Sequence, residues 1–157
     1  MFYLMIKPPP PLAGHIAAVH GPIDRAELLH VTLQPLGDRA ELDGAALDRL
    51  RRVVDGFDGR AFRVNFDRLR DSGRTVSLRG SDKIRGALRF QHALVQALAG
   101  HGFALPYTFR PHLTLRYRGT APGQWAIDPI GWMAEELLLV ESIDGRHEPF
   151  GRWSLPA

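Results

Sequence analysis

The spacing of apolar residues along the chain predicts a mixture of helices and strands. Residues 40–54 carry apolar side chains three and four positions apart, which is the period of an amphipathic helix. A second long helix is predicted to follow a cap at Ser81 or Asp82 and to end near Gly100 or Gly102. Its apolar positions are Ile84, Leu88, Val95 and Leu98.

Strands are predicted where apolar and polar residues alternate, or where a short apolar run is bounded by Gly and Pro. The predicted strands are residues 2–7, 28–33, 61–66, 74–79, 107–117, 136–141 and 150–155. Those at 61–66 and 74–79 are expected to be neighbours in one sheet. A short Ala-rich segment, residues 12–20, is predicted to be helical.

Prolines and glycines mark where these elements end. Pro35 and Gly37 are expected to close the strand at 28–33, and residues 119–131 are predicted to form a loop. The whole pattern predicts one α+β domain spanning residues 1–157, long enough to bury about two thirds of its unfolded surface.

The chain contains no cysteine, which excludes disulfides, thiolate-bound zinc and thiol nucleophiles. Its N-terminus carries no basic leader, and no apolar run is long enough to span a membrane. We therefore expect a cytoplasmic protein with no membrane partner.

The net charge is +3, and nearly all the basic side chains are arginines, because Lys7 and Lys83 are the only lysines. The planar fork of arginine suits bidentate recognition of phosphate. A GC-rich genome would produce the same excess of arginine, and we place that explanation first. The charge therefore permits a nucleic-acid partner without requiring one.

The most informative pattern is a His-x-Thr-Leu motif that occurs twice, at residues 30–33 and 112–115. Two such copies would arise by chance in well under about 1% of chains of this composition. Each copy follows a predicted helical segment, so the chain has two loosely similar halves. In a strand, the His and Thr of each motif face one side, and the residues after them face the core.

This set of groups suits the hydrolysis of a phosphodiester. A neutral imidazole can take a proton from water, and a protonated one can give a proton to the departing sugar oxygen. Threonine hydroxyls can donate to the non-bridging phosphate oxygens. We therefore predict His30, Thr32, His112 and Thr114 as the catalytic residues, with no metal or cofactor required.

Three further residues are candidates for substrate binding. Arg116 continues the strand face of His112 and Thr114, and Arg110 precedes them on that face, so either could contact a phosphate. The alternative for both is a solvated charge at a strand end. Tyr3 could stack on a base, with plain packing as the more common role.

A zinc site is the competing hypothesis for the histidines. His30 and His112, with either His15 or His20 and an aspartate, could bind zinc, but the chain has no His-x-x-x-His pair to preorganise such a site. The histidines without a matched context are left out of the predicted site: His15, His20, His92, His101 and His147. His92 falls inside a predicted helix, where surface exposure is the simpler account.

The paired motif resembles that of the 2H phosphoesterase superfamily, in particular the bacterial group of 2'-5' RNA ligase-like proteins, or RNA 2',3'-cyclic phosphodiesterases. The resemblance extends from the strand at residues 2–4, through residues 110–115, to residues 137–142. The chain departs from the family pattern at residues 34–37, where many members carry an aromatic residue followed by Leu-Gly.

The resemblance implies a bilobal α+β fold with pseudo-twofold symmetry, in which two antiparallel sheets surround a central cleft and helices lie outside. Each lobe would contribute one motif to the cleft. It also implies an enzyme that opens 2',3'-cyclic phosphates on RNA ends or nucleotides, with 2'-5' RNA ligation as a side activity. By position in the family, His30 would be the acid and His112 the base. We expect a monomer.

Two other functions stay open at this point. The same chemistry could act on 2'-5' oligoadenylate, an ADP-ribose cyclic phosphate or another small cyclic-phosphate metabolite. Alternatively, the chain could be a non-catalytic RNA-binding module on the same fold. Two intact motifs argue against the module, because a protein that only binds RNA needs no matched imidazoles.

Overall fold

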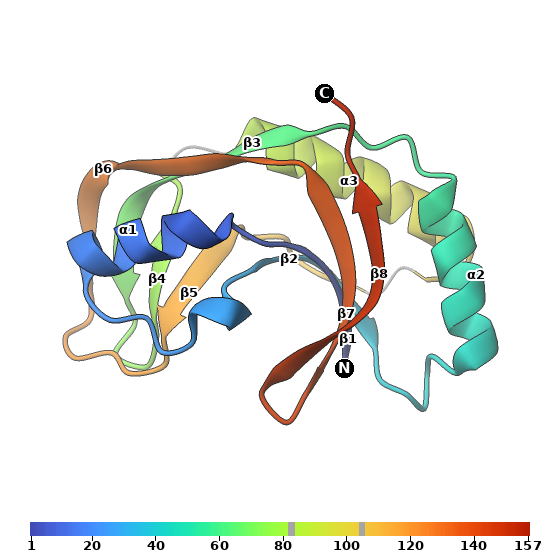
Figure 1. Cartoon of the computed structure of the whole chain (residues 1–157), viewed down its shortest axis with the longest axis horizontal. Helices are drawn as coiled ribbons and strands as arrows, with labels where there is room; N and C mark the ends of the chain where they lie inside the picture. Colours follow the sequence, from blue (N-terminus) through green and yellow to red (C-terminus); the bar gives the residue numbers. More distant parts are fainter. Residues whose placement is uncertain (82–83, 104–105) are drawn as a thin grey trace.

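The computed structural model describes residues 1–81, 84–103 and 106–157, which form two antiparallel sheets with helices packed against them (Figure 1). The first sheet has the order β2-β1-β7-β8 and consists of β1 (Phe2–Ile6), β2 (Val31–Gly37), β7 (Glu136–Ile143) and β8 (Arg146–Ser154). The second has the order β5-β4-β3-β6 and consists of β3 (Phe62–Asp71), β4 (Val76–Arg79), β5 (His112–Arg116) and β6 (Gly123–Ala134). The helices are α1 (Pro10–His20), α2 (Gly44–Asp55) and α3 (Arg85–Ala99), with a 3₁₀ turn, η1 (Ala26–Leu28). The predicted α+β class is confirmed.

A strand-helix-strand unit occurs in each sheet and carries one His-x-Thr motif. β1, α1 and β2 form one unit, and β4, α3 and β5 form the other. In each unit the two strands pair antiparallel, and the strand of the motif lies at the edge of its sheet. The two halves are therefore related in the pseudo-twofold manner that the resemblance implied.

The two sheets are joined with almost no linker. Only Glu135 separates β6 from β7, and Figure 1 shows the two strands as one long curved band. The carbonyl of Glu135 accepts a hydrogen bond from the N–H of Leu155 at 2.7 Å, which ties the end of the chain to this crossing point.

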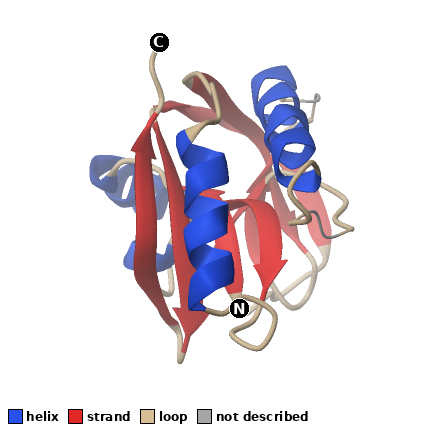
Figure 2. Ribbon diagram, turned by 90° about the vertical axis from the view of Figure 1, so that its right-hand side faces the viewer, coloured by secondary structure: helices blue, strands red, loops and turns tan. Residues whose placement is uncertain are grey.

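One apolar core joins the inner faces of both sheets to the helices. Asp43 caps α2 by accepting from the N–H of Ala46 at 2.8 Å, so the helix begins at Gly44 and not at residue 40. The residues that α2 and α3 bury recur at helical spacing: Ala46, Leu47, Leu50 and Val54, and Ala87, Phe90, Leu94 and Leu98. In Figure 2, α2 faces the viewer and lies in front of the strands.

The prediction of a loop at residues 119–131 is wrong, because β6 begins at Gly123. β6 is an edge strand, where one side of the backbone needs no ladder partner and proline is tolerated. Pro129 falls where the pairing with β3 shifts register between Phe66 and Arg68, outside the paired positions. Pro129 therefore marks a shift of register inside β6, whereas the sequence analysis took it as the sign of a loop.

The first motif strand also differs from its prediction at 28–33. Residues 26–28 form the 3₁₀ turn η1, and β2 begins at Val31. β2 then continues through Pro35 to Gly37, again because it lies at a sheet edge. The other predicted strands are present with shifted ends; β3 is longer than predicted and β5 shorter.

The predicted start of α3 is wrong as well. Its N-cap is Ile84, which makes no side-chain capping bond. Ser81 instead donates to the carboxylate of Asp67, through both its backbone N–H and its hydroxyl. Asp82, the other predicted cap, lies outside the described residues. Of the predicted apolar positions Leu98 is buried, whereas Ile84, Leu88 and Val95 are half-buried.

The segment that follows α1 docks on the second motif strand. The N–H of Asp24 donates to the carbonyl of Leu115 at 3.0 Å, and its carboxylate accepts from the N–H of Tyr117 at 2.7 Å. Because the first motif begins at His30, shortly after this segment, these bonds hold the start of β2 close to the end of β5.

Arg116 makes a second tie at the same place. Its Nη1 donates to the carbonyls of His20 and Pro22, each at 3.1 Å. Arg116→Ala should lower the free energy of unfolding by about 1–3 kcal/mol, because both carbonyls lose a charged donor. Chemical denaturation measures this, with the exposed Arg118→Ala as the control, for which a change within about 0.5 kcal/mol is expected. Equal effects of the two substitutions would contradict the structural role of Arg116.

Candidate active site

The two His-x-Thr motifs lie on strands that approach each other from different sheets. β2 and β5 have Cα atoms within 8 Å of one another. Both motifs show the same burial: the His and Thr side chains are half-buried, and the apolar residues after them are buried. Val31, Leu33, Leu113 and Leu115 are each at most 1% exposed. The core thus anchors each strand on one side and leaves an imidazole and a hydroxyl on the other.

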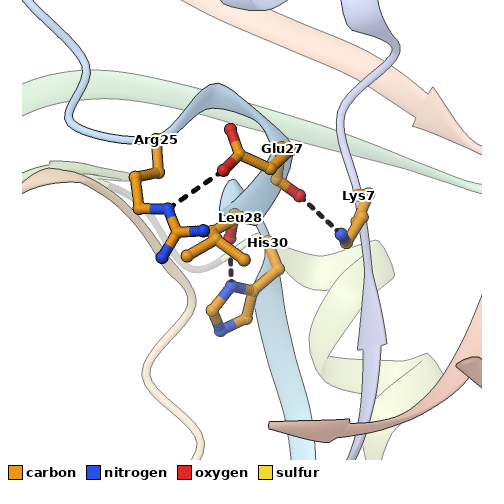
Figure 3. Close-up of polar contacts among 5 residues, drawn as sticks. All are labelled: Lys7, Arg25, Glu27, Leu28 and His30. Atoms are coloured by element: carbon orange, nitrogen blue, oxygen red, sulfur yellow. Dashed lines mark hydrogen bonds and ion pairs between the residues drawn. The ribbon is translucent and has the colours of Figure 1, made fainter. Parts of the chain in front are cut away.

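The two imidazoles are held by the same backbone contact. Nδ1 of His30 lies 2.6 Å from the carbonyl oxygen of Leu28, and Nδ1 of His112 lies 2.8 Å from that of Arg110. Figure 3 shows the first of these bonds. A carbonyl oxygen can only accept, so Nδ1 carries the proton in both rings. Nε2 is therefore the atom of each imidazole that is left to exchange a proton with a substrate.

The surroundings favour the neutral form of both rings. Burial lowers the pKa of His30, and the charges of Lys7 and His112 lower it further. Burial likewise lowers the pKa of His112, with a contribution from the charge of Arg79. In both cases the bond from Nδ1 to the backbone opposes the shift. Near neutral pH, the free protein thus presents two uncharged imidazoles.

A cavity of about 410 Å³ opens beside His30. The residues that line it are Tyr3, Arg25, Leu28, His30, Thr32, Tyr117, Ser142, Gly145 and His147. The predicted residues Tyr3, His30 and Thr32 are therefore brought together here. Arg25 and Lys7 flank the same site, and both interact with Glu27: Arg25 with its carboxylate, and Lys7 with its carbonyl (Figure 3).

His147 is a residue of this cavity that the sequence analysis left out. It lies on β8 opposite Ser142 of β7, and its ring meets that of His30 edge to face, with centroids 4.9 Å apart. Its Nδ1 is buried and has no hydrogen-bond partner among the described residues. No sequence signal pointed to it, because its position depends on the pairing of the last two strands.

Arg110 and Arg116, the other two residues predicted to bind substrate, do not line the cavity that contains Tyr3. Arg110 lines a separate cavity of about 380 Å³ on the His112 side, together with Arg79 and Phe109. Arg116 directs Nη1 to the backbone of residues 20 and 22. Contact of either arginine with a phosphate stays a prediction. Arg79 is the arginine directly opposite His112 in the sheet, a neighbour that only the strand register reveals.

The remaining histidines do not line the cavity beside His30. His15, His92 and His101 are exposed, and His20 is half-buried. Within the described ranges, no group of three or more His, Asp or Glu side chains is placed to hold a metal ion. No helix in the described part of the chain has the length and apolar character needed to cross a membrane.

The free energy of unfolding should fall as the pH decreases through the range in which the protonation of His147 differs between the folded and the unfolded chain. Burial lowers the pKa of His147 to about 4, and the charge of His30 contributes. An unfolded imidazole titrates near 6.5, so between about 4 and 6.5 the unfolded chain binds a proton that the folded chain rejects. The stabilising contribution of neutral His147 is therefore present above this range and is lost as the pH falls through it.

His147→Phe should reduce that loss by about 1 kcal/mol, a value discounted for the partial exposure of the ring. Urea denaturation at pH 7 and pH 4.5 measures it. His92→Phe is the matched control, because His92 is exposed on α3. An unchanged pH dependence in His147→Phe would contradict the buried, neutral state of His147.

Comparison with known proteins places the fold and the family. The model of the 2'-5' RNA ligase superfamily matches residues 8–145. A crystal structure of a phosphoesterase superposes with a TM-score of 0.78 at 23% identity, covering 99% of this chain and 98% of that one. Escherichia coli LigT in complex with 3'-AMP gives a TM-score of 0.75 at 24% identity, covering 98% and 97%. No curated protein gives a significant match in sequence.

A third solved structure, a protein of Thermus thermophilus, gives a TM-score of 0.70 at 18% identity and covers 98% of this chain and 97% of that chain. At these identities the likeness concerns the fold, which extends over the whole chain in each case. The match to the superfamily covers both His-x-Thr motifs.

Proposed function

Because the chain belongs to the 2'-5' RNA ligase superfamily, we propose that it is a two-histidine phosphodiesterase that hydrolyses a 2',3'-cyclic phosphate on RNA or on a nucleotide. The observation that carries this proposal is the matched bonding of the two imidazoles. Each Nδ1 is committed to a backbone carbonyl two residues before it, which leaves Nε2 of both rings available. Its catalytic residues are His30, Thr32, His112 and Thr114.

In the proposed reaction His112 is the base and His30 the acid, as their positions in the family imply. Nε2 of His112 takes a proton from water as the water oxygen forms its bond to phosphorus. The bond from phosphorus to one sugar oxygen of the ring breaks, and Nε2–H of His30 gives its proton to that oxygen. The same sequence with the 5'-hydroxyl of a second RNA end in place of water would form a 2'-5' linkage: the 5' oxygen bonds to phosphorus as the bond from phosphorus to the 3' oxygen breaks, and the 3' oxygen takes the proton of His30.

The lowered pKa of His112 suits its role as the base. The role of His30 as the acid requires the bound substrate to raise its pKa. His112 has to be neutral to accept a proton, and burial together with the charge of Arg79 favours that state. His30 has to be protonated, and a phosphodiester bound between the rings brings the negative charge that raises its pKa. Substrate binding and protonation of His30 are therefore coupled.

The threonines are proposed to stabilise charge on the phosphate. Thr32 lines the His30 cavity, and Thr114 lies on the same strand face as His112. Their hydroxyls can donate to the non-bridging oxygens as negative charge builds. Their β-branched side chains lose little freedom when held in that orientation.

A nucleotide substrate is supported by the relatives and by the cavity. LigT of E. coli has been crystallised with 3'-AMP, ATP, phosphate and NADP+. Tyr3 and Tyr117 line the cavity beside His30 and offer aromatic surfaces on which a base can stack.

Replacement of either catalytic histidine tests the mechanism. His30→Ala and His112→Ala should each lower kcat by about 10²–10⁴ on a 2',3'-cyclic nucleotide, because each removes a positioned acid or base. The double variant should be little worse than the worse single one, since the two groups act as a unit. His92→Ala on the exposed face of α3 is the control. Full activity in a folded single variant would rule out the two-histidine mechanism.

Chelation separates this mechanism from metal-assisted hydrolysis. Because an imidazole activates the water and hydroxyls stabilise the charge, activity should be retained after dialysis against EDTA. Hydrolysis rates before and after dialysis, and after addition of zinc or manganese, provide the measurement. Loss on chelation with recovery on adding metal would favour the alternative in which a metal activates the water.

A further inference from the structure

Arginines line the face of the second sheet that carries His112. In an antiparallel sheet, residues directly opposite one another point to the same side. Two rows cross this face: His112, Arg79 and Arg68 in one, and Thr114, Ser77 and Arg70 in the other. We refer to Arg68, Arg70 and Arg79 as the arginine face.

The opposite side of the same strands belongs to the core. Leu69, Leu78 and Leu113 form the row on that side, and they pack in the main apolar cluster. The arginines therefore project away from the core, on the side of the catalytic imidazole. Arg68 and Arg79 are half-buried, and Arg70 is exposed.

Ion pairs do not offset the charge of the arginine face within the described part of the chain. None of its members takes part in an ion pair among the described residues. Asp67, the carboxylate whose pKa the charge of Arg68 helps to lower, is bonded to Ser81. Burial lowers the pKa of Arg79, and the charges of Arg70 and Arg110 lower it further. Like charges held together on one sheet face cost stability, which an anion would recover.

The first sheet shows that the fold does not require these arginines. In the related half, the row that starts at Thr32 continues with Met5 and Leu138. Met5 and Leu138 are buried and pack with Val140 and Tyr3 in a small apolar cluster. The pseudo-symmetric halves therefore differ in chemistry: an apolar surface lies beyond Thr32, and Ser77 and Arg70 lie beyond Thr114.

We propose that the arginine face binds a second phosphate group of the substrate, in addition to the phosphodiester that reacts between the two imidazoles. Neighbouring strands lie about 4.8 Å apart, so the backbone of Arg68 is roughly 10 Å from that of His112. Arg79 lies between them, next to the reacting phosphate, and Arg68 and Arg70 extend the charge one strand further. This proposal rests on the proposed function for the position of the first phosphate.

Two sources could supply the second phosphate: a 5'-phosphate on the same nucleoside, or the next phosphodiester of an RNA chain. Both offer oxygens that the guanidinium fork binds in pairs. Calorimetric binding of adenosine 3'-monophosphate, adenosine 3',5'-bisphosphate and a 3'-phosphorylated dinucleotide distinguishes them, and it does not depend on catalysis.

The test compares wild type with Arg68→Gln/Arg70→Gln. In wild type a second phosphate should strengthen binding at least about tenfold over the monophosphate, the worth of one charge-assisted contact. In the double variant that ratio should approach one, and the salt dependence of binding should weaken by about one phosphate contact. Arg52→Gln/Arg74→Gln carries the same charge change at exposed positions of α2 and the β3–β4 turn, and should keep the ratio.

Each result decides the proposal. Both ligands carry the second phosphate on the 5' oxygen of the 3'-terminal nucleoside, so their relative affinity separates the sources: tighter binding of the bisphosphate assigns the site to a terminal 5'-phosphate, and dinucleotide binding at least as tight assigns it to the phosphodiester of an RNA chain. Equal affinity for all three ligands in wild type, or a preference that survives in the thermally stable Arg68→Gln/Arg70→Gln variant, overturns it. Tight, arginine-dependent binding without any hydrolysis of cyclic phosphates would instead sink the proposed function and leave the second phosphate site standing.

Discussion

The site depends on the docking of the segment after α1 against the end of β5. Through Asp24 and the carbonyls that receive Arg116, this segment joins a loop of the first strand-helix-strand unit to the second motif strand. The two motif strands are edges of different sheets and share no ladder, so their relative position has to come from contacts of this kind. α3 packs against β2 of the first sheet and against β3 of the second, which also fixes the position of one sheet relative to the other.

Within that frame, one local geometry is used twice. Each histidine donates from Nδ1 to the carbonyl two residues before it, and the residue directly after each histidine is buried. The two imidazoles are thereby made alike, and any difference between the proposed acid and the proposed base has to come from their neighbours. Those neighbours do differ: His30 meets the ring of His147, whereas His112 lies beside Arg79.

Sequence patterns predicted what local periodicity can encode. The α+β class, the helices and the pairing of β3 with β4 were confirmed, and both motifs face the same way on their strands. The patterns failed where the position in a sheet overrides a local signal, as at Pro35 in β2 and Pro129 in β6, because an edge strand tolerates proline. His147 and Arg79 were missed because only the strand register brings them to His30 and His112.

The single residue between β6 and β7 has a consequence for the entropy of substrate binding. With Glu135 alone at the crossing, and its carbonyl bonded to Leu155, this connection offers no hinge about which one sheet could swing against the other. The entropy of bringing two reactive groups together is then lost when the chain folds and not each time a substrate binds. On the proposed function, such a site favours substrates whose shape already matches the fixed spacing of the two imidazoles.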